Sequence, residues 1–132
     1  MRFFLQQANI LDIHADVLIC SANVCLNLTG GVGADIVHRY GNQMQSDLHI
    51  QIADRTPRCA WQGEVFTVQT DGLPYKAVLH AVAVDPMYHS SVDIITQTVY
   101  KAFGIADEFA AKTVALTALA SGAFAATGGK AK

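Results

Sequence analysis

Short apolar runs alternate with stretches of helical periodicity along this chain. Residues 17–22 and 77–84 form continuous apolar, partly β-branched runs, which are typical of strands covered on both faces. Residues 63–70 alternate between apolar and polar positions, and residues 113–119 form a last short apolar run, so both are expected to be strands. The β-prone run 2–6 predicts a further short strand at the start of the chain.

Helical spacing separates these runs. Residues 34–40 follow a glycine loop and stop at Gly41, as a helix would. Within residues 43–55, apolar residues recur every four positions and share one helix face: Met44, Leu48 and Ile52. A longer helix is expected to be capped by Ser90, with Asp93 three residues on, and carries a second apolar stripe: Ile95, Val99, Ala102, Ala106 and Phe109.

This order of elements predicts the α/β fold class. Because strands alternate with helices, the sheet should be mixed and largely parallel, with helices on both faces in a three-layer α/β/α arrangement. The chain has 132 residues, which fits a single domain over 1–132. Hydrophobic residues make up 52% of it and charged residues 15%, so a sizeable core is possible and disorder is not expected.

Charge and cysteine usage exclude several functions. The net charge of −2 leaves no basic surplus for a phosphate backbone, so a nucleic-acid partner is not expected. Three cysteines without a CxxC pair, and histidines without metal-ligand spacing, predict neither a disulfide framework nor a metal or cofactor site. Cys20 and Cys25 are expected to be buried thiols, and His80 a structural core residue. With neither a signal peptide nor a run of membrane-spanning length, the chain is expected to be cytoplasmic, with no membrane partner.

The first candidate site is the glycine loop 29–33, between a predicted strand and a predicted helix. Glycines let the main chain approach an anion, and the following helix offers unpaired N–H groups and a positive dipole end, so phosphate fits there. The spacing matches neither dinucleotide fingerprint, and a simple tight turn is an equal alternative. Asn23 ends the preceding strand, where its amide could bind a sugar hydroxyl or form a local turn.

A second candidate loop, 120–124, follows the last predicted strand. Ser121 offers a hydroxyl, Gly122 a bare main chain, and Phe124 an aromatic face for a ribose or base. The alternative is a turn with Phe124 packed in the core. Ligands of open α/β sheets bind beyond the carboxyl ends of strands, and both loops are expected at such ends.

Taken in order, these segments resemble the macro domain family. Ala8-Asn9-Ile10, residues 15–23 and Gly30-Gly31-Val32 are similar to its Gly-Asp-Ile start, its Val-Asp-Ala-Ile-Val-Asn-Ala-Ala-Asn strand and its Gly-Gly-Gly-Val loop. Residues 63–65, 73–76 and 79–82 are similar to its Gly-Glu, Leu-Pro-x-Lys and Ile-His-x-Val segments, and residues 118–124 to its last loop. The likeness covers nearly the whole chain at compatible spacing.

The resemblance implies a ligand, ADP-ribose or a related nucleotide, and a role for each matching position. Asn9, in place of an aspartate, and Ile10 would meet the adenine, and Asn23 the distal ribose. One side of the diphosphate would be wrapped by Gly30, Gly31, Val32 and Gly33, and the other by Ser121, Gly122, Ala123 and Phe124.

Two departures from the family pattern bear on these roles. Gly33 stands where hydrolytic members often carry an aspartate, and Asp35 would point elsewhere. The resembling family normally continues with one more helix and strand, for which residues 125–132 are too short, so the chain is expected to be either a fragment or a C-terminally short domain with a rearranged first strand.

Three functions remain open on the sequence. The first is binding of ADP-ribose or a derivative, including an ADP-ribosylated protein. The second is hydrolysis of ADP-ribosyl or O-acetyl-ADP-ribose substrates, with Asn23 positioning the water or the ribose. The third is a truncated structural module that binds no nucleotide.

Overall fold

The computed structural model describes residues 2–69 and 71–119. The sequence order of the elements in this part of the chain is η1 (Ile10–Asp12), β1 (Val17–Ser21), α1 (Gly31–Tyr40), α2 (Gln43–Gln51), β2 (Val65–Val68), β3 (Ala77–Ala81), α3 (Val92–Glu108) and β4 (Val114–Leu116).

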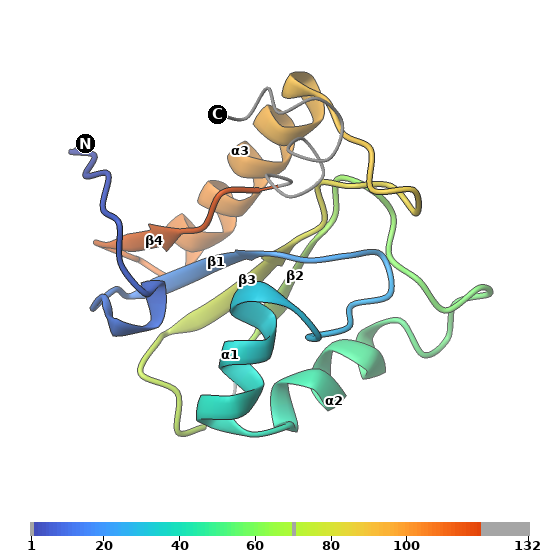
Figure 1. Ribbon diagram of the computed structural model, residues 1–132, viewed down its shortest axis with the longest axis horizontal. Helices are drawn as coiled ribbons and strands as arrows, with labels where there is room; N and C mark the ends of the chain where they lie inside the picture. Colours follow the sequence, from blue (N-terminus) through green and yellow to red (C-terminus); the bar gives the residue numbers. More distant parts are fainter. Residues whose placement is uncertain (1, 70, 120–132) are drawn as a thin grey trace.

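The strands form one mixed sheet in the order β2-β3-β1-β4. β1 runs parallel to both β3 and β4, with Ile19 opposite Leu79 on one side and Leu116 on the other, and β2 is antiparallel to β3. Figure 1 shows α1 and α2 on one side of this sheet and α3 on the other. The three-layer, largely parallel fold predicted from the sequence is therefore confirmed.

Each face of the sheet has its own core, because alternate residues of β1 and β3 point to opposite sides. Leu18, Cys20 and Val78 pack with α1 and α2, whereas Ile19 and Leu79 pack with α3. The predicted helix stripes fill these cores. Met44, Leu48 and Ile52 are buried under the first face, and Ala102 and Ala106 under the second. The two central strands are thus covered on both faces, which explains why they are almost entirely apolar.

The start of α3 differs from the prediction by one residue. Ser91, not Ser90, is the N-cap: its backbone is extended and its Oγ accepts a hydrogen bond from the N–H of Ile94 at 3.2 Å. Either adjacent serine could cap the helix, and the extended backbone at Ser91 decides between them.

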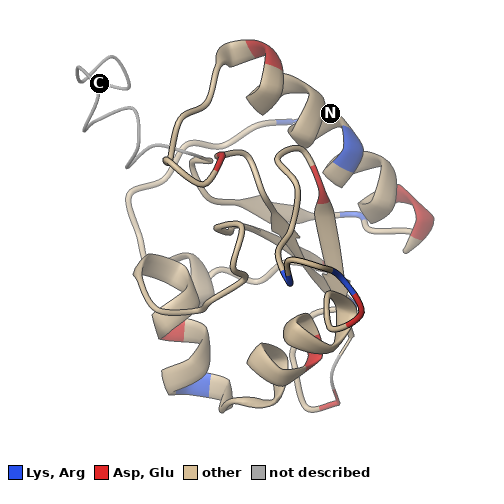
Figure 2. Cartoon of the chain, turned by 90° about the vertical axis from the view of Figure 1, so that its right-hand side faces the viewer, with Lys and Arg blue, Asp and Glu red and all other residues tan. Residues whose placement is uncertain are grey.

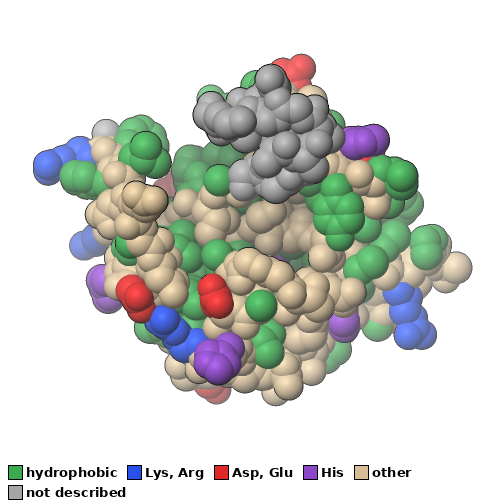
Figure 3. Space-filling model, in the orientation of Figure 1, with side chains coloured by type: hydrophobic (Ala, Val, Ile, Leu, Met, Phe, Trp, Pro, Cys, Tyr) green, Lys and Arg blue, Asp and Glu red, His purple; other side chains and the backbone are tan. Residues whose placement is uncertain are grey.

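The expected strand at residues 2–6 is not formed. No described residue pairs with this segment, and Phe3, Phe4 and Leu5 are all exposed. Figure 3 shows apolar side chains on this arm at the upper left of the molecule. The last strand is also shorter than predicted: it covers Val114–Leu116 alone. Strand propensity without a pairing partner does not fix a strand, which explains the wrong prediction for the arm.

Asp16 joins the two parallel strands β1 and β4 at their starting ends. Its carboxylate accepts hydrogen bonds from the main-chain N–H of Lys112 at 2.7 Å and Thr113 at 3.4 Å. These bonds, chiefly the one from Lys112, lower the pKa of Asp16 below its ordinary value.

Charged residues are sparse and mixed on this fold. Figure 2 shows Lys and Arg scattered among Asp and Glu over the described chain. None of the described helices combines the length and apolar character needed to cross a bilayer.

Candidate nucleotide site at the end of β1

Asn23 lies just beyond the end of the central strand β1. Its Oδ1 accepts a hydrogen bond from the main-chain N–H of Asn27 at 3.1 Å, and its Nδ2 donates one to the Asn27 carbonyl at 3.3 Å. The local-turn alternative for Asn23 is therefore part of the structure. An amide has two N–H groups and two acceptor lone pairs, so one donor and one acceptor site remain for a ligand.

The glycine loop leads directly into the N-terminus of α1. Gly30 is its N-cap without a side-chain hydrogen bond, and Gly31 has a positive φ of 54°. A Cβ at Gly30 or Gly31 would meet nothing within 4 Å. Among described residues, none accepts a hydrogen bond from the N–H of Gly31, Val32 or Gly33. With no acidic residue in the first turn, these N–H groups and the helix dipole would suit a negatively charged ligand.

Gly33 has a different environment from Gly30 and Gly31. It is buried, and a Cβ there would lie 3.1 Å from Leu28 Cα and 3.3 Å from Leu28 Cδ2. Glycine therefore allows α1 to pack closely against the preceding loop. A side chain at this position, including the carboxylate of hydrolytic family members, would have to displace Leu28. Asp35, further along α1, is exposed.

Two side chains of α2 hold the loop between β1 and α1. Gln45 accepts from the Leu28 N–H at 2.7 Å and donates to the Leu26 carbonyl at 2.6 Å. His49 Nε2 lies 3.2 Å from the Cys25 carbonyl and 3.1 Å from Asn27 Oδ1. Gln45 and His49 are four residues apart and so share one helix face. This role was not predicted from the sequence, where its only signal is a polar i, i+4 pair next to the Met44–Leu48 stripe.

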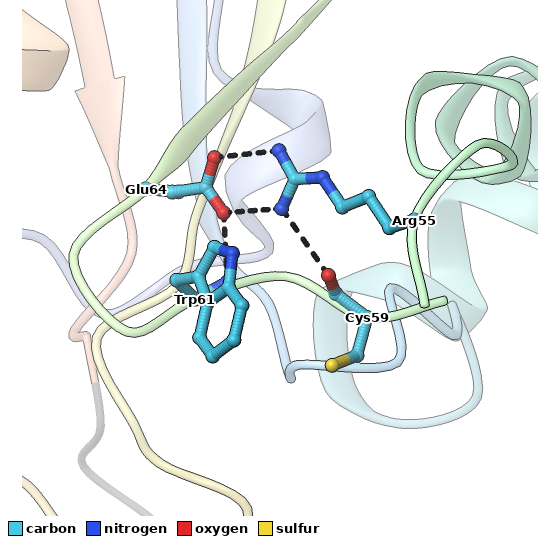
Figure 4. Close-up of polar contacts among 4 residues, drawn as sticks. All are labelled: Arg55, Cys59, Trp61 and Glu64. Atoms are coloured by element: carbon cyan, nitrogen blue, oxygen red, sulfur yellow. Dashed lines mark hydrogen bonds and ion pairs between the residues drawn. The ribbon is translucent and has the colours of Figure 1, made fainter. Parts of the chain in front are cut away.

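The opposite side of this loop contacts the segment before β2. Ala60 N–H donates to the Val24 carbonyl at 2.7 Å. Figure 4 shows how that segment is fixed. The two terminal guanidinium nitrogens of Arg55, Nη1 and Nη2, donate to the Glu64 carboxylate at 2.6 and 2.9 Å. Nη1 also donates to the Cys59 carbonyl. Arg55 lowers the pKa of Glu64 below its ordinary value, so the carboxylate stays ionised.

The prediction that Cys25 is buried is wrong, because it lies exposed in the turn after Asn23. Cys20 in β1 is buried as predicted. His80 is fully buried in β3, as the structural interpretation requires, with its Nε2 3.2 Å from the sulfur of Met44. Burial lowers its pKa to about 4, so the imidazole is neutral at pH 7. Within residues 2–69 and 71–119, no group of three or more His, Cys, Asp or Glu side chains could hold a metal ion.

Asn9 and Ile10, the positions expected to meet the adenine, lie at the start of the short helix η1. Asn9 caps η1, its Oδ1 accepting from the Leu11 N–H at 3.0 Å. Arg39 donates to the Leu11 carbonyl at 2.9 Å. Arg39 is in the last turn of α1, at the other end of the helix from Gly31. The segment after Asn9 and Ile10 therefore lies against the last turn of α1, and the adenine roles of these two residues stay predictions. The second predicted loop, Ser121, Gly122, Ala123 and Phe124, lies outside the described residues.

A separate pocket of about 270 Å³ lies at the opposite end of the sheet. It forms where α1 ends and α2 begins, next to the turn that precedes β3. Its walls are Arg39, Tyr40, Gln43, Met44, Asp71, Gly72 and Leu73. Because β1 and β3 are parallel, this end carries their starts and not the carboxyl ends, where ligands of such sheets bind.

Comparison with known proteins identifies the family and supports the fold. The sequence model of the macro domain family matches residues 19–131, so the chain belongs to the macro domain family. An uncharacterised protein of Saccharolobus solfataricus is 29% identical over 94% of this chain, which spans 68% of that relative. An uncharacterised protein of Mycobacterium bovis is 26% identical over 89% of this chain, which spans 31% of it.

Solved structures with the same fold include two macrodomains. The macrodomain of Mycobacterium tuberculosis DarG superimposes with a TM-score of 0.69 at 16% identity, over 89% of this chain and 76% of that one. The macrodomain of Thermus aquaticus DarG gives 0.65 at 14% identity, over 83% and 72%. At such identities the likeness concerns the fold alone.

Proposed function

We propose that this chain binds ADP-ribose or an ADP-ribose derivative at the loop between β1 and α1. Open space over Gly30 and Gly31, at a helix N-terminus whose N–H groups are unpaired in the described chain, carries the proposal. The diphosphate lies against the N–H groups of Gly31, Val32 and Gly33, where the helix dipole stabilises negative charge. Membership of the macro domain family, which binds ADP-ribose and its derivatives, supports this choice of ligand.

Asn23 takes the distal ribose in this proposal. Its amide keeps one donor and one acceptor site after binding Asn27, which suits a sugar hydroxyl. A protein-linked ADP-ribosyl group is a ligand of the same chemistry. The adenine contacts of Asn9 and Ile10, and the second wrap by residues 121–124, stay predictions from the family resemblance.

Hydrolysis has less support than binding. Gly33 supplies no carboxylate to act as a base, and Leu28 occupies the space next to it. Asn23 is then a ligand-binding residue and not a catalytic one.

Calorimetric titration of the folded chain with ADP-ribose and with AMP tests the proposal. We expect binding of ADP-ribose and at least tenfold weaker binding of AMP, which lacks the diphosphate and the distal ribose; tenfold corresponds to about 1.4 kcal/mol. Asn23→Ala should weaken ADP-ribose binding and leave AMP unaffected. A folded protein that gives no heat at millimolar ADP-ribose would instead support the non-binding alternative.

A further inference from the structure

The loop that carries Asn23 is held by α2, a helix that itself lies outside the proposed nucleotide contacts. Gln45 and His49 contact the four consecutive loop residues from Cys25 to Leu28. Gln45 binds main-chain atoms only. His49 also contacts a side chain, that of Asn27, whose own main chain holds both polar atoms of the Asn23 amide.

Chemistry fixes the direction of the His49 contacts. Its Nε2 faces two oxygens, the Cys25 carbonyl at 3.2 Å and Asn27 Oδ1 at 3.1 Å. Both oxygens can only accept a hydrogen bond, so Nε2 carries the proton and donates. The nearby Nε2 of Gln45, at 3.1 Å, donates one of its two N–H groups to the Leu26 carbonyl, and the two oxygens outnumber this one donor around His49 Nε2. The imidazole therefore holds Cys25 and Asn27 at a fixed separation.

We propose that His49 is a positioning residue for the candidate site, acting through Asn27 to orient the amide of Asn23. The path is continuous: His49 Nε2 holds the Asn27 side chain, and the Asn27 main chain holds Asn23 Oδ1 and Nδ2. Without His49, the Cys25 carbonyl and the Asn27 side chain lose their contact with α2, and the Asn23 amide can rotate away from the ligand. This inference rests on the proposed function, because Asn23 needs a fixed orientation only if it binds a ligand.

The path predicts effects on binding without a matching loss of stability, because His49 and Asn27 are both exposed. We expect His49→Ala and Asn27→Ala each to weaken ADP-ribose binding three- to tenfold. Asn27→Asp keeps an acceptor for the imidazole and should retain most of the affinity. Gln51→Ala is the matched control, since Gln51 is also on α2 but donates to the Thr67 carbonyl at 2.9 Å, away from the loop.

A double-mutant cycle separates positioning from a general effect on the helix. If His49 acts only through Asn23, His49→Ala should change the dissociation constant no further in an Asn23→Ala background. Additive effects, or a loss of affinity in Gln51→Ala equal to that in His49→Ala, would overturn the inference.

Side-chain NMR makes the test independent of ligand binding. The Nδ2 protons of Asn23 should shift and exchange faster with solvent in His49→Ala and Asn27→Ala, but not in Gln51→Ala. Unchanged Asn23 signals in the first two variants would refute the positioning role. A wild-type chain that fails to bind ADP-ribose while these signals still respond would refute the proposed function alone.

Discussion

Gly30→Ser is expected to change stability and ligand binding in opposite directions. Gly30 is the N-cap of α1, with extended φ and ψ of −147° and 161° and no side-chain cap. Serine favours this conformation, and its hydroxyl can accept from the unpaired N–H groups of the first turn. Because a Cβ at this position meets nothing within 4 Å, the folded protein accommodates serine without strain.

The expected gain in stability is modest. Capping contributes a few tenths of a kcal/mol over glycine, and loss of freedom in the unfolded chain a similar amount, about 0.5–1 kcal/mol in total. For a domain of this size that raises the melting temperature by about 3 °C.

The same hydroxyl occupies the space proposed for the diphosphate. It competes for the main-chain N–H groups and keeps the phosphates from approaching them. A hydrogen bond to a charged group contributes about 1.5–3 kcal/mol, so loss of one should weaken ADP-ribose binding at least tenfold.

Differential scanning calorimetry and titration calorimetry on the same preparation measure both effects. Gly104→Ala is the control: Gly104 lies exposed in α3, a Cβ there also meets nothing within 4 Å, and alanine should stabilise the helix by about 0.5–1 kcal/mol. Its dissociation constant should equal that of the wild type. A Gly30→Ser protein that melts higher and binds ADP-ribose unchanged would refute the placement of the diphosphate.

Three further predictions concern stability. Because the pKa of His80 falls from 6.5 to about 4 on folding, the unfolded chain binds a proton first, and stability should drop by about 1.4 kcal/mol per pH unit between these values; His80→Leu should flatten this part of a urea-unfolding profile, and an unchanged slope would contradict it. The lowered pKa of Glu64 contributes stability that is present above its ordinary pKa and lost as pH falls through the lowered one; Glu64→Gln should therefore cost about 1–2 kcal/mol at pH 7 and progressively less as the pH falls through that lowered pKa, measured by chemical denaturation. Gly33→Ala should cost about 1–3 kcal/mol because Leu28 Cα lies 3.1 Å from the new Cβ; a melting temperature equal to that of the wild type would show that the loop yields freely.

The sequence predicted the fold best where pattern and burial coincide. β1 and β3 are covered on both faces, so their residues are apolar except for Ser21 and His80, and the four-residue spacing of Met44, Leu48 and Ile52 survives as a buried stripe. It failed at the arm 2–6, where strand propensity has no described pairing partner. The choice between Ser90 and Ser91 as N-cap depended on where the backbone leaves the extended conformation, which two adjacent serines do not reveal.

Prediction of the candidate site followed the same division. Asn23 and the glycine loop are close in sequence and follow one strand, so their grouping at its carboxyl end was predictable. The hydrogen bonds from Gln45, His49 and Ala60 to the loop depend on how α2 and the segment before β2 pack against it. Such long-range packing cannot be predicted from the local sequence around the loop. The packing of Gly33 against Leu28 was hidden for the same reason, since a glycine in a loop signals conformational freedom and close approach equally.

Amide chemical-shift mapping of the whole chain with ADP-ribose tests the central claim most directly. We expect the largest changes at the main-chain amides of Gly31, Val32 and Gly33, together with the side-chain amide of Asn23. Changes centred instead on Arg39, Asp71 and Leu73, around the pocket at the other end of the sheet, would contradict the account, as would a spectrum that does not respond to the ligand.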